Sequence, residues 1–129
     1  MGARKFTGQV RALECKRCGE VYIDGASGVL MELAAARWLA EHGFSGGDEI
    51  RFMRKAARLR AVDLAELLGV SAEAVSHWET GKHQPDRGTL ATIAALALDA
   101  MEGRTTTRDR LRALGKPARA PKSVKLDAA

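Results

Sequence analysis

Two short helix-like stretches with a tight turn between them, within residues 61–80, constrain the fold of this chain more than any other feature. The first stretch carries apolar side chains at helical spacing and ends at Gly69. Ser71 is a good N-cap residue for the second stretch, and Gly81 is typical of a helix end. Because Val75 points back toward the first stretch, we predict that the two helices lock together and leave the outer face of the second one open.

Further helix-like segments lie on both sides of this pair. Apolar periodicity and capping residues predict helices over residues 29–42, 48–59, 62–68, 72–80, 86–101 and 105–114. Two short strands, residues 10–14 and 21–23, are expected to form a hairpin before them, and residues 44–47 are expected to form a hinge-like break. The broad apolar coverage of residues 29–42 predicts burial on more than one side, against the second unit or against another subunit.

These elements predict a mainly α fold in three parts. A knuckle hairpin plus a helix would occupy residues 1–44, and a four- to five-helix domain would occupy residues 45–102. Residues 103–129 are predicted to be a basic C-terminal extension that is partly disordered, because prolines and scattered basic side chains provide little apolar surface to bury.

The length and the apolar segments exclude several classes of protein. The chain has 129 residues, enough for one domain or two very small units and too few for a large multidomain enzyme. The longest nearly apolar run, residues 90–101, is too short for a bilayer, so we expect no membrane partner. Residues 1–10 lack the apolar core of a secretory signal, which predicts a cytoplasmic protein with reduced cysteines. The sequence has no Ser/His/Asp set, no acid pair in a recognisable frame and no Gly-rich phosphate loop, so we expect no enzymatic activity.

The positive charge of the chain is concentrated in two places. The formal net charge is +5, and residues 103–129 hold eight basic side chains against two acidic ones. Five of the remaining basic side chains fall within residues 51–60, where the spacing of Arg51, Arg54/Lys55 and Arg58 predicts a cationic side on the helix. This distribution predicts a polyanionic partner, although basic tails are also common as solubilising extensions.

Three segments carry a family resemblance. Residues 49–55, 64–71 and 75–82 read EIRFMRK, LAELLGVS and VSHWETGK. Together they resemble the phage-repressor-like (XRE, Cro/C1) DNA-binding domain, over roughly residues 48–98. The resemblance implies a lambda-repressor-like helix-turn-helix fold that binds double-stranded DNA. The sequence departs from the family pattern at Ala61, where glutamine is common, and at Ala72 and Glu73, where long amide or basic side chains are usual.

The outer face of the second helix of the pair is the predicted reading surface. The candidate base-contacting residues are Ala72, Glu73, Ser76 and His77. Glu73 can accept from a cytosine amino group, Ser76 can bond either kind of base edge, and His77 can donate to a guanine or contact a phosphate. The candidate phosphate contacts are Ser71, Lys82, Arg54, Lys55 and Arg60.

Each of these residues also has a structural interpretation. Glu73 and His77 are four positions apart, so they can instead pair with each other, bind a metal or simply be solvated. Trp78 is expected in the core, and Glu79 is expected to bond a helix end or a neighbouring arginine.

Cys15 and Cys18 have the spacing of a zinc knuckle, in which a turn directs both thiolates at one metal ion. The segment from Cys15 onward resembles the MqsA/YgiT-type zinc-knuckle antitoxins, in which two Cys-x-x-Cys pairs hold zinc, with the first pair missing here. Three alternatives are therefore open for the zinc site. His42 or another group of the chain completes it, or two subunits each donate one cysteine pair, or the knuckle holds no metal. A thioredoxin-like redox motif is the competing interpretation, and the βαβ pattern that it requires is absent.

These patterns together predict a sequence-specific transcriptional regulator that acts as a dimer on a palindromic operator, because a single helix-turn-helix offers few base contacts. The alternative is an antitoxin that neutralises a toxin protein and regulates its own operon. The expected partners are double-stranded DNA, a second copy of the chain and, in the alternative, a toxin.

Overall fold

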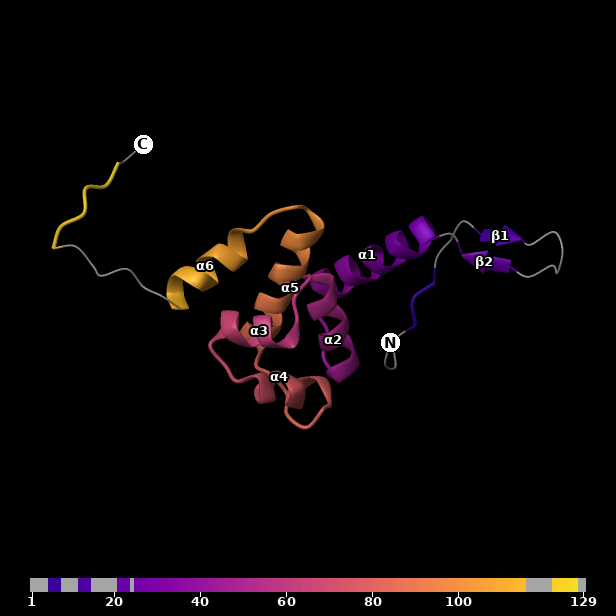
Figure 1. Ribbon diagram of the computed structural model, residues 1–129, viewed down its shortest axis with the longest axis horizontal. Helices are drawn as coiled ribbons and strands as arrows, with labels where there is room; N and C mark the ends of the chain where they lie inside the picture. Colours follow the sequence, from indigo (N-terminus) through magenta and orange to yellow (C-terminus); the bar gives the residue numbers. More distant parts are fainter. Residues whose placement is uncertain (1–4, 8–11, 15–20, 24, 116–121, 128–129) are drawn as a thin grey trace.

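The computed structural model describes residues 5–7, 12–14, 21–23, 25–115 and 122–127, and these form a mainly helical protein (Figure 1). The helices are α1 (Gly25–His42), α2 (Gly47–Ala56), α3 (Ala61–Leu68), α4 (Ala72–Glu79), α5 (Arg87–Met101) and α6 (Thr106–Gly115). The mainly α fold class is therefore confirmed. None of these helices is long and apolar enough to cross a bilayer.

Two short strands precede the helices. β1 (Ala12–Glu14) and β2 (Val21–Ile23) pair antiparallel, with Leu13 opposite Tyr22. Figure 1 shows them beyond the N-terminal end of α1, away from the other helices. Cys15 and Cys18, the predicted knuckle cysteines, lie outside the described residues.

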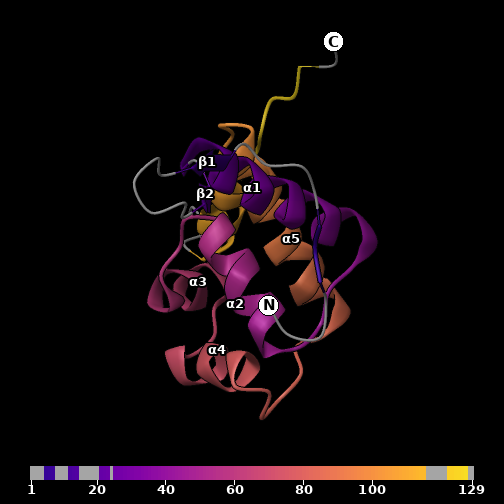
Figure 2. The ribbon, with the colours of Figure 1, turned by 90° about the vertical axis from the view of Figure 1, so that its right-hand side faces the viewer.

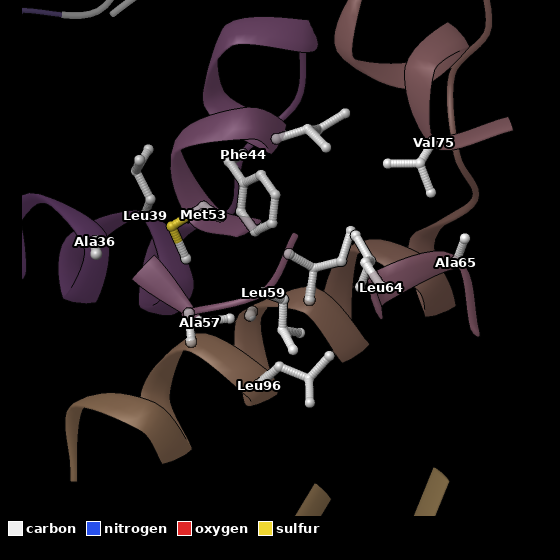
Figure 3. Close-up of a cluster of buried hydrophobic side chains, with 14 residues drawn as sticks. Ala36, Leu39, Phe44, Met53, Ala57, Leu59, Leu64, Ala65, Val75 and Leu96 are labelled. Carbon is white, nitrogen blue, oxygen red and sulfur yellow. The ribbon is translucent and has the colours of Figure 1, made fainter. Parts of the chain in front are cut away.

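One apolar core joins the first five helices. Its largest fully buried side chains come from α1 to α5: Leu39, Ile50, Met53, Leu64, Val75 and Ile93. Figure 3 shows side chains of separate helices meeting there around Phe44. Fully burying one such aliphatic side chain stabilises a fold by about 1.5–3 kcal/mol, so this shared core holds the five helices as one body.

The chain breaks between α1 and α2, as the sequence predicts, but the segment is packed into the body and is not hinge-like. Phe44 is buried in the core, and Gly47 is the first residue of α2 rather than part of a loop. The glycines suggested a flexible break because they permit many backbone conformations. Gly46 uses that freedom for a φ of 86°, which turns the chain directly into α2.

α1 begins earlier than predicted and is buried on one side. It starts at Gly25 instead of residue 29, because the small residues before residue 29 continue the helix. Ala35, Ala36 and Leu39 face the core, and α1 packs mainly against α5. Leu30 on the other side is 66% exposed, so burial against the helical body accounts for only part of the apolar surface of α1.

The end of α2 differs from the prediction, because α2 stops at Ala56 and not near Leu59. Arg58 adopts a left-handed backbone with a φ of 61°. The Arg58 amide donates to the Lys55 carbonyl at 3.0 Å, and the Leu59 amide donates to the Arg54 carbonyl at 3.3 Å. This is the Schellman arrangement, which favours glycine at the position that Arg58 occupies. A non-glycine residue in this conformation costs about 1 kcal/mol.

α6 is fixed to the end of α5 through Asp99. One carboxylate oxygen of Asp99 accepts from the Thr107 amide at 2.9 Å, and the other lies 3.5 Å from the Arg104 Nε. These contacts hold the pKa of Asp99 below its ordinary value, chiefly through the Thr107 hydrogen bonds. The helix predicted for residues 105–114 is confirmed as α6. The contacts of Asp99 attach it to the end of α5.

Candidate nucleic-acid interface

The α3–α4 pair has the helix-turn-helix geometry that the sequence predicts. Gly69 ends α3 with a φ of 68°, and the Ser71 Oγ caps α4 by accepting from the Ala74 amide at 3.1 Å. Val75 and Leu64 are both fully buried between the two helices. Figure 2 shows α4 at one end of the helical body, below α2 and α3.

The outer face of α4 is open to solvent. Ser71, Ala72, Glu73 and Ser76 are all exposed, and Lys82 is exposed in the turn after the helix. His77 differs from these residues, because only 25% of its side chain is accessible. The structure thus places the predicted base-contacting residues on one accessible surface, with His77 partly set into it.

His77 is held by two neighbours. Its Nε2 lies 3.6 Å from Oε1 of Glu73, whose own side chain is 78% exposed. Its ring meets the ring of His83 edge to face, with 5.0 Å between the centroids, and the His83 amide donates to the His77 carbonyl at 3.2 Å. The predicted Glu73–His77 contact is therefore present. Among the described residues, no group of three or more His, Cys, Asp or Glu side chains is arranged to hold a metal ion.

A buried ion pair fixes α4 to α2. Arg54 donates from Nε and Nη2 to the two carboxylate oxygens of Glu79, at 2.9 Å each. Its Nη1 donates to the Leu59 carbonyl at 3.0 Å, and both side chains of the pair are 10% exposed. A planar, doubly hydrogen-bonded pair fixes the relative orientation of two elements better than a single contact does. Glu79 therefore has the structural role that the sequence predicts.

Arg54 is a correction to the predicted phosphate contacts. Each of its three guanidinium nitrogens donates a hydrogen bond inside the protein, so the side chain is turned away from solvent. The sequence placed it on the cationic side of α2 because it shares helical spacing with Arg51 and Arg58. Arg51 does lie on that surface: its side chain is 62% exposed, and its Nε is 3.6 Å from Glu79 Oε1.

Gly47 is a site residue that the sequence reasoning missed. A Cβ atom on Gly47 would overlap the backbone carbonyl of Glu79, so the start of α2 touches the end of α4 directly. Only glycine permits this approach. The adjacent pair of glycines before an acidic helix start was the available signal, and it was interpreted as a flexible break.

The other predicted phosphate contacts remain on the surface. Lys55 and Lys82 are exposed, and the Arg60 side chain is 80% exposed while its Nε and Nη2 donate to Asp63 at 3.0 Å each. These hydrogen bonds raise the pKa of Arg60 and lower that of Asp63. Arg60 is thus a paired, solvent-facing cation at the start of α3.

A family model described as a helix-turn-helix domain matches residues 47–111, which is half of the chain and covers α2 to α5 and most of α6. No curated protein matches the chain, and no solved structure matches it. The match includes the capped turn between α3 and α4, and it extends to the helix that Asp99 ties to the body. On this evidence the chain belongs to the helix-turn-helix domain family.

Proposed function

We propose that this protein is a transcriptional regulator of the XRE type that binds a specific sequence in double-stranded DNA by placing α4 in the major groove. The observation that carries the proposal is the open outer face of α4 together with the buried Arg54–Glu79 pair behind it. A rigidly held helix with a solvent-exposed polar face is what base recognition in the major groove requires. The proposal includes no catalytic step.

Glu73, Ser76 and His77 would carry the base contacts. Glu73 would accept from a cytosine amino group and Ser76 would bond either kind of base edge, each from an exposed position. His77 would donate to a guanine or to a phosphate from a ring already oriented by Glu73 and His83. A good base contact discriminates by about 1–3 kcal/mol, so a few such residues provide modest specificity per half-site.

Phosphate contacts would come from exposed groups around α4. Ser71 caps the start of α4, and Lys82 follows its end. Lys55 lies on α2, and Arg60 lies at the start of α3. Contacts of this kind set the position of the protein on the duplex without reading sequence. Binding should therefore weaken steeply with added salt.

A second copy of the chain would supply the second half-site. Two helix-turn-helix units related by a two-fold axis reach half-sites about 34 Å apart, so the operator would be palindromic. Leu30 and Val29 on the exposed side of α1 are the large apolar side chains suited to such an interface. A monomer in solution and on DNA would contradict this part of the proposal.

The antitoxin function is the second candidate. The same exposed apolar residues of α1 follow the cysteine segment that resembles the antitoxins, so they favour a protein partner near the N-terminal part of the chain. Co-expression with the product of an adjacent toxin-like reading frame tests it. A stable complex that restores growth would support the antitoxin function, and growth arrest with no complex would reject it.

Zinc bound by Cys15 and Cys18 stays a prediction, because both residues lie outside the described part of the chain. Metal analysis combined with the oligomeric mass distinguishes the alternatives. One zinc per two chains in a dimer indicates that each subunit donates a pair, and one zinc per chain indicates further ligands from the same chain. Metal-free protein after zinc loading indicates an empty turn.

A mobility-shift assay with DNA from the protein's own promoter tests the main proposal. His77→Ala combined with Lys82→Ala should weaken specific binding by about tenfold or more, because it removes one base contact and one phosphate contact. Arg110→Ala is the control, since it removes one exposed cation on α6. Binding equal to wild type in the double variant would reject the assignment of α4 to the groove.

A further inference from the structure

The loop between α2 and α3, the outer side of α3 and α6 together line a cavity of about 590 Å³. This volume falls within the range of small-molecule sites in proteins. Neither the Arg54–Glu79 pair nor the exposed residues of α4 belong to its lining. None of the proposed DNA contacts lines the cavity, although Arg60 donates to Asp63 in its wall.

Three arginines line this cavity, and none of them forms an ion pair within residues 25–115. Arg58 comes from the loop after α2, and Arg108 and Arg112 are one turn apart on α6. Ion pairs within residues 25–115 involve Arg37, Arg51, Arg54, Arg60 and Arg104, and none of them involves these three residues. Arg108 has one long hydrogen bond, to the Ala57 carbonyl at 3.5 Å. Like charges one turn apart repel each other, and a bound anion would remove that repulsion.

The acidic residues of the lining offset these arginines only in part, and Arg108 is close enough to Asp63 for its charge to help lower the pKa of that carboxyl. Asp63 is already bonded by Arg60, through two hydrogen bonds of 3.0 Å. Glu66 is the other acid of the wall. Three cations against one unpaired acid leave the cavity with positive potential, and guanidinium groups suit carboxylate or phosphate oxygens.

Apolar side chains line another part of the cavity. Leu59 is buried, and Leu67 and Leu111 are half-buried beside it. A duplex backbone presents mainly charged phosphates, which three leucines do not match and which Glu66 would repel. A small molecule that carries a negative group on an apolar body matches both kinds of surface.

From these observations we infer that the cavity between α3 and α6 binds an anionic small molecule, a carboxylate or phosphate monoester attached to a hydrocarbon or aromatic group. Its charged group lies against Arg58, Arg108 and Arg112, and its apolar part lies against the leucines. The left-handed backbone of Arg58 agrees with this role, because glycine is the residue that this position favours structurally.

Titration calorimetry on the full chain, with octanoate and octyl phosphate as separate probes, tests the inference. We expect saturable binding at one site per chain, and the tighter of the two probes identifies the preferred charged group. Octanol and acetate each lack half of the required chemistry, so each should bind about tenfold more weakly or worse. Absence of saturable binding by both charged probes would overturn the inference.

Substitutions then locate the site. Arg108→Gln with Arg112→Gln should weaken binding of the tighter probe by about tenfold or more, whereas Arg110→Gln, on the same helix and outside the lining, should leave it unchanged. Arg58→Gln gives the same test from the other wall if the double variant fails to fold. Equal binding in wild type and in these variants would overturn the inference. A second result would also overturn it. If the chain shows no saturable probe binding and the double variant shows a lower salt dependence of DNA binding, these arginines are phosphate contacts.

Discussion

The contact between α2 and α4 and the cavity between α3 and α6 use the same kind of side chain in opposite ways. In the first region, Arg54 is enclosed and bonded to both oxygens of Glu79. In the second, Arg108 and Arg112 face a cavity and form no ion pair among the described residues. A count of positive charges treats these arginines alike, yet Arg54 fixes α4 in place, whereas Arg108 and Arg112 are available to a ligand.

The difference shows which property separates a structural arginine from a binding one. A buried, unpaired charge at Arg54 would destabilise the fold, so the stability of the fold depends on the geometry of the Arg54–Glu79 pair. Exposure alone would leave Arg108 and Arg112 as ordinary surface cations. Their position on a concave surface with leucines beside them makes binding the better explanation.

The largest effect is expected from breaking the buried pair. Arg54→Met should lower the free energy of unfolding by about 3 kcal/mol or more, because it leaves the Glu79 carboxylate largely buried without its main partner. Arg51→Met is the matched control, since Arg51 contacts the same carboxylate at 3.6 Å from an exposed position and should cost less than about 1 kcal/mol. Urea denaturation measures both, and equal losses would show that the pair does not fix α4.

The next effect concerns the close approach of α2 to α4. Gly47→Ala should lower the free energy of unfolding by about 1–3 kcal/mol, because the new methyl group would overlap the Glu79 carbonyl. Gly28→Ala is the control: it meets open space in the helix α1 and should be neutral or stabilising by up to about 1 kcal/mol. Thermal denaturation compares the two variants. A stabilising Gly47→Ala would mean that the two helices are not in contact there.

The sequence predicted the local parts of this structure well. Gly69, Ser71 and Gly81 define the ends of α3 and α4 through backbone conformations and caps that act over a few residues. The same is true of Asp86, whose carboxylate accepts from the Thr89 amide at 2.7 Å at the start of α5. Signals of this range can be interpreted without knowing the fold.

The errors concern contacts between residues far apart in the chain. The cationic side of α2 was assigned from spacing alone, and spacing does not reveal that Glu79, 25 positions later, lies against Arg54. Gly47 was interpreted as flexible because its neighbour in space, the Glu79 carbonyl, is invisible in the local sequence. The α3–α6 cavity was missed for the same reason, since residues from three separate segments form it.

A smaller effect concerns the junction that holds α6 beside the cavity. The folded protein keeps the pKa of Asp99 below its ordinary value of 3.8, so this carboxylate stabilises the fold above that value. The stability is lost as the pH falls through the lower, folded pKa. Asp99→Asn should therefore reduce the free energy of unfolding near neutral pH and flatten its decline in acid. Denaturation at a series of pH values from neutral to acid measures the free energy of unfolding of the wild type and of Asp99→Asn. Parallel plots of this free energy against pH would reject the role of Asp99.

The smallest effect separates backbone strain from ligand binding at Arg58. Arg58→Gly should raise the free energy of unfolding by up to about 1 kcal/mol, because glycine adopts a φ of 61° without steric cost. Gly69→Ala is the opposite control, since it places a side chain at a φ of 68° and should lower stability by a similar amount. If Arg58→Gly gains stability while losing affinity for the charged probes, the arginine is retained for the cavity at the expense of the fold. If it loses stability instead, the Arg58 side chain is structural, and the contrast between the paired and the unpaired arginines would then rest on α6 alone.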